Sequence, residues 1–151
     1  MRIALYQPEI AGNVGAILRT ATCFGIAVDI IEPCGFPFSQ RGLKRAGMDY
    51  ADHADITRHA NWDAYAAAYS GTGRLVLFTT RGAQPLPAFA FQHGDRLLFG
   101  NESSGVPPEI HAAADAHVVI PLRPGFRSLN VSVAAGIALA EALRQTKGFA
   151  P

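Results

Sequence analysis

Cysteine is scarce in this chain, and membrane-length apolar runs are missing. The 151 residues contain two cysteines, Cys23 and Cys34, without a CxxC pair or a Cys/His cluster. This usage is typical of a reducing compartment and predicts two free, mostly buried thiols. The five histidines match no zinc-ligand spacing, so we expect no metal site.

Segments that would direct the chain to or through a membrane are also missing. The longest plainly apolar stretch, Val133–Ala140, is far shorter than the roughly 18 residues that a membrane span needs. The first six residues run directly into Gln7-Pro8-Glu9, which leaves no room for the apolar core of a secretory signal. We therefore expect a soluble, cytoplasmic protein with no membrane partner.

Charge of either sign is weak overall, since the formal net charge is +1. This balance neither demands nor excludes a nucleic acid, so the local distribution matters more. Arg41, Lys44 and Arg45 lie in an acid-free segment, and Arg123 and Arg127 flank an acid-free loop. These five residues are candidate RNA contacts, although small clusters of this kind are often ordinary solvated charge.

The length predicts one domain covering residues 1–151, large enough to form a stable hydrophobic core without disulfides or bound metals. Its hydrophobic share of 49% is consistent with apolar surface covered by a second subunit. Helices are predicted at Asn13–Phe24, with Asn13 as cap and Gly25 closing the helix, and at 39–46, Asn61–Tyr69 and Leu129–Lys147. The inner stripe of the last helix is predicted to be Leu129, Val133, Ile137, Ala140 and Leu143.

Five apolar segments alternate with these helices: Ile3–Tyr6, Ala27–Glu32, Arg74–Thr80, Arg96–Phe99 and His117–Leu122. The late segments are continuously apolar, which indicates a parallel sheet covered on both faces. The fold class is therefore predicted to be α/β, with helices flanking a mostly parallel sheet.

The ends of the strands indicate where a ligand binds. The turn after the first strand has neither a G-x-G-x-x-G nor a P-loop pattern, which argues against an ordinary dinucleotide-binding domain. Small polar residues and glycines instead follow the last three strands, at Thr79-Thr80, Gly100–Gly105 and Pro121–Asn130. Because ligands of open α/β sheets bind at the carboxyl ends of the strands, these loops predict one small-molecule pocket.

Three segments carry a resemblance to a known family. They are Asn13-x-Gly15-x-x-x-Arg19, Leu98–Val106 and Ile120–Ser132, in this order and spacing. Together they resemble the SPOUT (α/β-knot) family of RNA methyltransferases. The compact length, Ile31-Glu32-Pro33 and Leu43–Tyr50 are most similar to its minimal members, which methylate the wobble cytidine or uridine of tRNA. Gly12, Asn101 and Ser104 depart from that subgroup's usual residues, and Ser104 stands where the subgroup often has a basic residue.

The resemblance implies a fold and a reaction. The fold would have a C-terminal trefoil knot, and the enzyme would be a homodimer with a shared active site. It would transfer a methyl group from S-adenosylmethionine to a ribose 2′-hydroxyl of tRNA, leaving S-adenosylhomocysteine. The partner would be RNA and not DNA, and the sulfonium chemistry requires no metal.

The resemblance also implies roles for particular residues. The cofactor contacts would be Phe78, Gly100, Ile120, Leu122, Ser128 and Leu129. Arg19 would hold the reacting ribose and its phosphate, in its own subunit or across the dimer, because a guanidinium cannot readily act as a base. Asn13 would belong to the catalytic group or only cap a helix, and Glu102 would orient its loop or accept a proton.

Ser128 and Asn130 complete the predicted catalytic group. They precede the last helix, where they would bind ligand or cap the helix. Two further alternatives stay open at this stage: a related enzyme that acts on another tRNA position or on ribosomal RNA, and a non-catalytic RNA-binding protein of the same fold.

Overall fold

A computed structural model of the chain describes residues 1–39, 42, 53–81 and 84–150. Its centre is a seven-stranded sheet in the order β3-β2-β1-β6-β4-β7-β5, and every neighbouring pair is parallel. The strands are β1 (Arg2–Tyr6), β2 (Ala27–Ile31), β3 (Ile56–His59), β4 (Leu75–Phe78), β5 (Gln84–Pro85), β6 (Arg96–Phe99) and β7 (Ala116–Val119). The predicted parallel α/β architecture is thereby confirmed.

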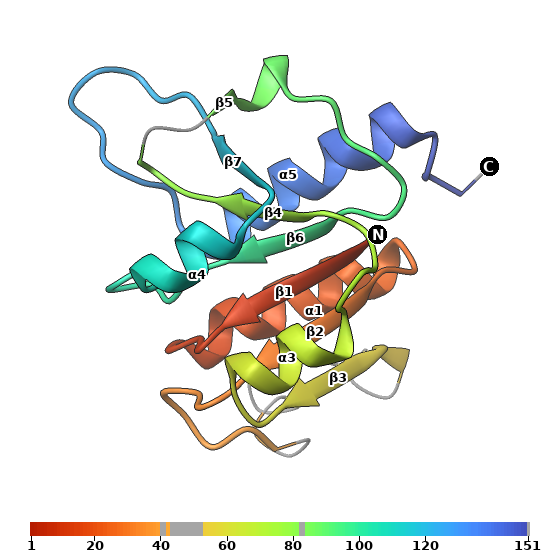
Figure 1. Cartoon of the computed structure of the whole chain (residues 1–151), viewed down its shortest axis with the longest axis vertical. Helices are drawn as coiled ribbons and strands as arrows, with labels where there is room; N and C mark the ends of the chain where they lie inside the picture. The colour runs from red at the N-terminus through yellow and green to blue at the C-terminus, as the bar shows by residue number, and fades with distance from the viewer. Residues whose placement is uncertain (40–41, 43–52, 82–83, 151) are drawn as a thin grey trace.

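Two layers of helices cover this sheet (Figure 1). Helices α1 (Ala11–Cys23) and α5 (Val131–Thr146) cover one face, where Val14, Ile17 and Leu139 meet Ile3 and Leu5. The shorter helices α3 (Trp62–Ala68) and α4 (Pro108–Ala113) cover the other face, through Tyr65 and Ile110. Successive strand residues point to opposite faces, which divides the core into these two clusters. A short 3₁₀ helix, η2 (Leu86–Ala88), follows β5.

The predicted inner stripe of α5 is wrong except at Leu143. Val133 is 50% exposed and Ile137 is 40% exposed, and Ala140 is exposed as well, whereas Ala135, Ala138, Leu139 and Ala142 are buried. The predicted Leu129 lies before the helix and is also exposed. The reason is that small alanines allow the helix to approach the sheet and α1 closely. The larger branched side chains are therefore left on the outer face.

Helix α1 also differs from its prediction at its start. Its N-cap is Ile10, without a side-chain cap, and Asn13 lies inside the first turn with its side chain buried. Asn13 is therefore not the helix cap. At the other end the prediction is confirmed, because the helix stops at Cys23 and Gly25 follows with φ +66°.

Four short elements of the described part of the chain are missing from the sequence prediction: β3, β5, η2 and α4. β3 is an edge strand with mixed polar side chains, β5 has two residues, and α4 has six residues. Elements this short leave almost no periodic signal. The predicted helix at 39–46 falls almost entirely outside the described residues. Both cysteines are free, but Cys23 is exposed, so the expectation of mostly buried thiols is only half right.

No helix in the described part of the chain is long and apolar enough to cross a membrane.

Candidate functional site

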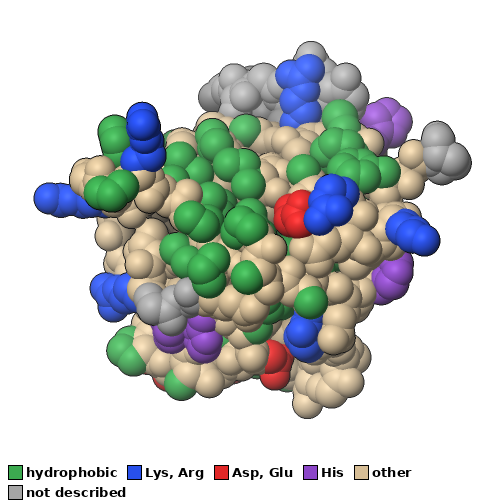
Figure 2. Space-filling model, turned by 90° about the horizontal axis from the view of Figure 1, so that it is seen from above, with side chains coloured by type: hydrophobic (Ala, Val, Ile, Leu, Met, Phe, Trp, Pro, Cys, Tyr) green, Lys and Arg blue, Asp and Glu red, His purple; other side chains and the backbone are tan. Residues whose placement is uncertain are grey.

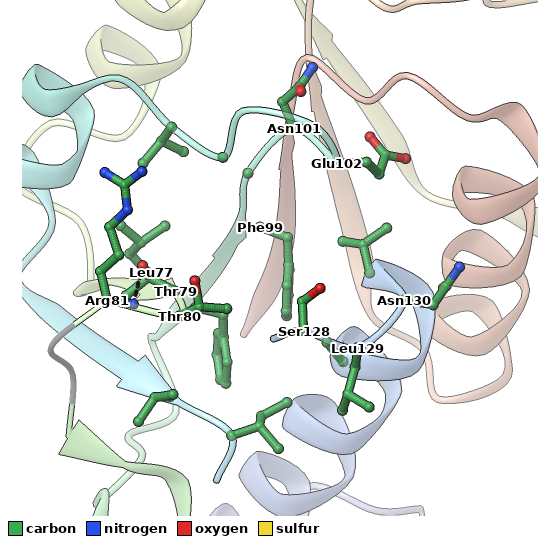
Figure 3. A pocket seen from close by; sticks show the side chains of 18 of the residues that line it. Leu77, Thr79, Thr80, Arg81, Phe99, Asn101, Glu102, Ser128, Leu129 and Asn130 are labelled. Atoms are coloured by element: carbon green, nitrogen blue, oxygen red, sulfur yellow. Dashed lines mark hydrogen bonds between the residues drawn. The ribbon is translucent and has the colours of Figure 1, made fainter. Parts of the chain in front are cut away.

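The carboxyl ends of β4, β6 and β7 surround a cavity of about 550 Å³ (Figure 3). Its walls come from the loops after these three strands and from the first turns of α1 and α5. The three polar strand ends that indicated a pocket therefore converge on one space.

One wall of the cavity is apolar and aromatic. The rings of Phe78 and Phe99 stack at a centroid distance of 4.9 Å, and Ile120 and Leu122 lie on the same lining. All six residues predicted to contact the cofactor line this cavity: Phe78, Gly100, Ile120, Leu122, Ser128 and Leu129. Their contact with a cofactor remains a prediction, but the structure brings them together.

Three predicted catalytic residues that line the cavity are joined by a chain of hydrogen bonds. Asn130 Nδ2 donates to Asn13 Oδ1 at 2.9 Å, and Asn13 Nδ2 donates to Glu102 Oε1 at 3.1 Å. Asn130 Oδ1 accepts from the backbone N–H of Ser132 at 2.8 Å, which makes it the N-cap of α5. This chain, the Glu102–Asn13–Asn130 relay, joins the β6 loop to the starts of both long helices.

The carboxylate of Glu102 is also held by backbone amides. Oε2 accepts from the N–H of Glu9 at 2.8 Å, and Oε1 accepts from the N–H of Ile10 at 3.3 Å. These amides lie at the start of α1, where N–H groups have no helical partner and the helix dipole favours an anion. Glu102 thus caps α1 from a distance, which fits its predicted role of orienting the motif loop.

The loop after β6 is fastened to the loop after β1 by a second set of contacts. Asn101 Nδ2 donates to the carbonyl of Gln7 at 2.8 Å, while its Oδ1 accepts from the backbone N–H of Ser103 and of Ser104. The hydroxyl of Ser103 donates to Glu9 Oε1 at 2.8 Å, and its backbone N–H donates to Glu9 Oε2 at 3.1 Å. These two hydrogen bonds from Ser103 lower the pKa of the Glu9 carboxyl. Asn101, one of the departures from the subgroup, therefore organises the loop.

Gly100 is required by the loop itself. A Cβ at this position would lie 2.6 Å from the carbonyl carbon of Gly105, and an isolated antiparallel bridge joins Asn101 to Gly105. Gly105 has φ +71°, a left-handed conformation that favours glycine. A side chain at Gly100 would therefore displace the loop before it met any ligand.

The predicted RNA-contact residues divide into three groups. Arg127 lines the cavity, and Arg123 is exposed in the same loop. Arg41, Lys44 and Arg45 lie outside the described residues.

The predicted catalytic Arg19 is exposed on α1 and is not among the cavity-lining residues. It follows Asn13 by about 120° around the helix, so the two side chains leave α1 in different directions.

Phe99, His111 and Arg81 are among the lining residues that sequence reasoning missed. Phe99 looked like the end of a buried strand, and His111 belongs to the short α4 that was not predicted. Arg81 follows the Thr79-Thr80 strand end, and its backbone N–H donates to Thr79 Oγ1 at 3.1 Å (Figure 3). The signal for Arg81 was present, because a cation directly after a polar strand end faces the same edge of the sheet.

Known proteins resemble the chain along its whole length. A relative from Beijerinckia indica subsp. indica, named tRNA (cytidine(34)-2′-O)-methyltransferase, is 53% identical over 98% of this chain and 93% of its own length. A solved structure described as giving structural insights into the 2-OH methylation of C/U34 on tRNA superposes with a TM-score of 0.91. It is 42% identical over 97% of this chain and 96% of that one.

A third likeness concerns the cofactor. An AdoMet-bound rRNA methyltransferase from Sinorhizobium meliloti superposes with a TM-score of 0.84 and 30% identity, over 95% of this chain and 55% of that one. The likenesses bear out the predicted α/β-knot fold class. The model of the SpoU rRNA Methylase family matches residues 1–140. The chain therefore belongs to the SpoU methylase family, as its motifs predicted.

Proposed function

We propose that this protein transfers a methyl group from S-adenosylmethionine to the ribose 2′-hydroxyl of nucleotide 34, the wobble nucleotide, of tRNA. The observation that carries the proposal is the cavity, which gathers all six predicted cofactor residues beside the Glu102–Asn13–Asn130 relay. The names of relatives at up to 53% identity support tRNA as the substrate.

The cavity fits S-adenosylmethionine in size and chemistry. Pockets for ligands of this kind are roughly 300–1,000 Å³, and this one is about 550 Å³. The Phe78 and Phe99 rings and Ile120 offer an apolar wall suited to the adenine. Ser128 and the amides at the start of α5 offer hydrogen bonds for polar groups. When bound, the cofactor supplies a methyl group that its sulfonium charge already activates.

The protein itself must align the reacting groups and stabilise the charge that develops on the ribose oxygen. The relay fixes the relative positions of the β6 loop, α1 and α5, so that the cavity mouth keeps one shape. The proposed role of Arg19 is to bind the phosphate beside the reacting ribose with its planar fork and to stabilise the alkoxide as the proton leaves. Arg81 and Arg127 line the cavity and Arg123 is exposed in the same loop as Arg127. These three arginines would attract the RNA, together with Arg41, Lys44 and Arg45.

The location of Arg19 leads us to propose a homodimer. The exposed positions of α1 are Gly12, Ala16, Arg19 and Cys23, at helical spacing. Beside them α5 exposes Val133, Ile137 and Ala140, and together these residues form the α1–α5 face. Figure 2 shows hydrophobic side chains gathered over the face seen from above, on the side where α5 lies. A two-fold pair through this face would cover its apolar residues and bring Arg19 of one subunit to the cavity of the other.

Sedimentation tests the dimer. We expect a species of twice 16.0 kDa for the wild type and a 16.0 kDa monomer, without methylation, for Ala140→Asp. The matched control is Ala67→Asp, an exposed alanine on α3 in the other helical layer. A wild type that sediments only as a monomer would overturn the proposal.

The reaction is tested with labelled S-adenosylmethionine and total tRNA, followed by mass spectrometry of the modified nucleoside. We expect 2′-O-methylation at position 34, without added metal, and none on DNA. Methylation of another tRNA position or of ribosomal RNA would instead support the related-enzyme alternative. Cofactor binding without transfer to any RNA would support a non-catalytic protein. Because its substrate is tRNA, we place the protein in the cytoplasm.

A further inference from the structure

The loop between β7 and α5 exposes a large aromatic side chain beside the cavity. Phe126 is 73% exposed, more than any other large hydrophobic residue in the described part of the chain. Its loop extends from the body at the upper left of Figure 1. In Figure 2, basic and hydrophobic side chains lie next to one another on that side of the molecule. Single exposed apolar side chains are common on protein surfaces, so the surroundings of this ring decide whether it serves a partner.

The backbone presents this ring on a stiff turn. The N–H of Phe126 donates to the carbonyl of Arg123 at 3.3 Å, which closes a four-residue turn. Pro124 and Gly125 occupy its two central positions, and Gly125 has φ +94°, the pattern of a type II turn. Proline fixes one central φ and glycine tolerates the other, so little backbone freedom is left to lose on binding. The turn therefore holds the exposed ring of Phe126 in one position.

The surroundings of Phe126 identify the chemistry of the partner. Arg123 and Arg127 flank it, and no carboxylate in the described part of the chain forms an ion pair with either arginine. The next residues, Arg127, Ser128 and Leu129, line the cavity. An aromatic ring between two cations suits a flat, uncharged surface attached to phosphates, which describes a nucleotide of single-stranded RNA.

We infer that Phe126 stacks on an unpaired base of the RNA substrate while Arg123 and Arg127 contact the phosphates on either side. The inference rests on the proposed function and adds a positioning role to it. A ribose can enter the mouth of the cavity only if its nucleotide leaves the regular stack of the RNA loop. The ring of Phe126 replaces part of the lost stacking, because every base has a face that an aromatic ring can cover.

The test compares Phe126→Ala and Phe126→Trp with the wild type. Loss of one base-stacking contact commonly lowers affinity by about 5- to 150-fold. We expect Phe126→Ala to lower kcat/KM for tRNA within this range, mainly through KM, and Phe126→Trp to retain nearly the wild-type value. The affinity for S-adenosylmethionine, measured by calorimetry, should stay unchanged in both. The matched control is Phe149→Ala, an exposed ring that packs on Phe24 away from the cavity.

A second experiment identifies the base. A series of tRNAs is prepared, each lacking one base of the anticodon loop but keeping the ribose. The penalty of Phe126→Ala should disappear on the one tRNA that lacks the stacked base and persist on the others.

Three results would overturn the inference: wild-type kinetics for Phe126→Ala, an undiminished penalty on every abasic tRNA, or an altered sedimentation coefficient, which would assign the ring to a contact between protein copies. Failure of the proposed function would look different, because the wild type itself would leave nucleotide 34 unmethylated. In that case the ratio of RNA-binding affinities between wild type and Phe126→Ala still tests the stacking.

Discussion

The arginines at the two ends of the sheet have different surroundings. At the amino ends of the strands, Arg2 forms two hydrogen bonds with the carboxylate of Asp29, and Arg74 forms two with Asp95. Both aspartates are fully buried. At the carboxyl ends, Arg81 and Arg127 line the cavity and Arg123 is exposed in the same loop as Arg127, and none of the three forms an ion pair in the described part of the chain.

This difference separates structural from functional charge. The hydrogen bonds that Arg2 donates to Asp29 and Arg74 donates to Asp95 raise the pKa of both arginines above the ordinary value, so both guanidinium groups stay charged. Such charges are neutralised within the fold and attract little from outside. The positive charge around the cavity is left for an anionic partner, and a protein with a net charge of +1 can still bind RNA there.

The largest effect is expected from removing a buried carboxylate at the amino end. Asp29 accepts from Arg2, from Tyr69 Oη at 2.8 Å, and lies 2.8 Å from His59 Nε2. Asp29→Ala would leave these groups without their shared partner and should lower the free energy of unfolding by about 3–5 kcal/mol. Urea denaturation at one fixed protein concentration measures it. The exposed Asp63→Ala should cost less than about 1 kcal/mol. Equal effects in the two variants would mean that the amino-end cluster is not structural.

The next largest effect is expected at Arg19. Arg19→Ala should lower the single-turnover methylation rate by about 10²–10³, by analogy with a lost oxyanion donor, and leave cofactor affinity nearly unchanged. Arg19→Lys should also stay slow, because a point charge does not reproduce the planar fork. A wild-type rate in Arg19→Ala would make it an ordinary surface residue.

Mixed dimers decide which subunit Arg19 serves. Leu122→Trp should fill the cavity of its own chain and block cofactor binding there. A dimer of one Arg19→Ala and one Leu122→Trp subunit regains one complete site if Arg19 acts on the partner's cavity. It regains none if Arg19 acts within its own chain. Recovery of activity on mixing the two inactive variants therefore supports the shared site.

The sequence was most informative where a local motif met a general rule of topology. The pocket could be predicted because parallel strands end at one edge of the sheet. The six predicted cofactor residues came from the resemblance to the family, and each lies at or after such a strand end on the cavity lining. The orientation of α5 could not be predicted, since Val133 and Ile137 on one side are as apolar as Ala138 and Leu139 on the other. Packing against the sheet, and not periodicity, decided which side is buried.

Long-range polar contacts also could not be predicted from the sequence. The hydrogen bond between Asn13 and Asn130 joins residues 117 positions apart, and nothing local in either segment indicates the other. Read alone, Asn13 resembles a helix cap, which the structure contradicts. The turn chemistry of Pro124-Gly125 could be read locally, but the exposure of Phe126 depends on where the loop leaves the fold.

A smaller effect is expected from cutting the relay. Asn130→Ala removes both the cap of α5 and the donor to Asn13, leaving a buried acceptor without its partner. The cost to stability should be about 1–3 kcal/mol, together with a lower kcat at unchanged KM for tRNA. Asn130→Ser keeps a capping oxygen but not the donor. If it restores stability without restoring kcat, the relay positions the site; if it restores both, Asn130 is only a cap.

The contribution of Arg123 and Arg127 to tRNA binding should be measurable from the salt dependence of the affinity. The logarithm of affinity falls with the logarithm of salt at a slope of about −0.7 per phosphate neutralised on a single strand. Arg123→Gln and Arg127→Gln should each flatten the slope by about that amount. Arg144→Gln, which removes an exposed arginine already paired with Glu141, is the control and should leave the slope unchanged. An unchanged slope in all three would mean that the cavity-side arginines face away from the RNA.

The smallest effect is expected from that exposed pair as the pH changes. Hydrogen bonds from Arg144 and then from Gln145 lower the pKa of the Glu141 carboxyl to about 2, from an ordinary value of 4.5. An acid whose pKa is lowered in the folded state stabilises the protein above its unfolded pKa, and this contribution is lost as the pH falls from about 4.5 towards 2. Arg144 is 68% exposed, so solvent screens the pair and its contribution at pH 7 should be much smaller than that of the buried Asp29 cluster. Urea denaturation of Glu141→Gln and wild type at pH 7 and pH 3 measures it, and the small difference at pH 7 should shrink at pH 3. A difference as large as that of Asp29→Ala would contradict the distinction between buried and exposed ion pairs.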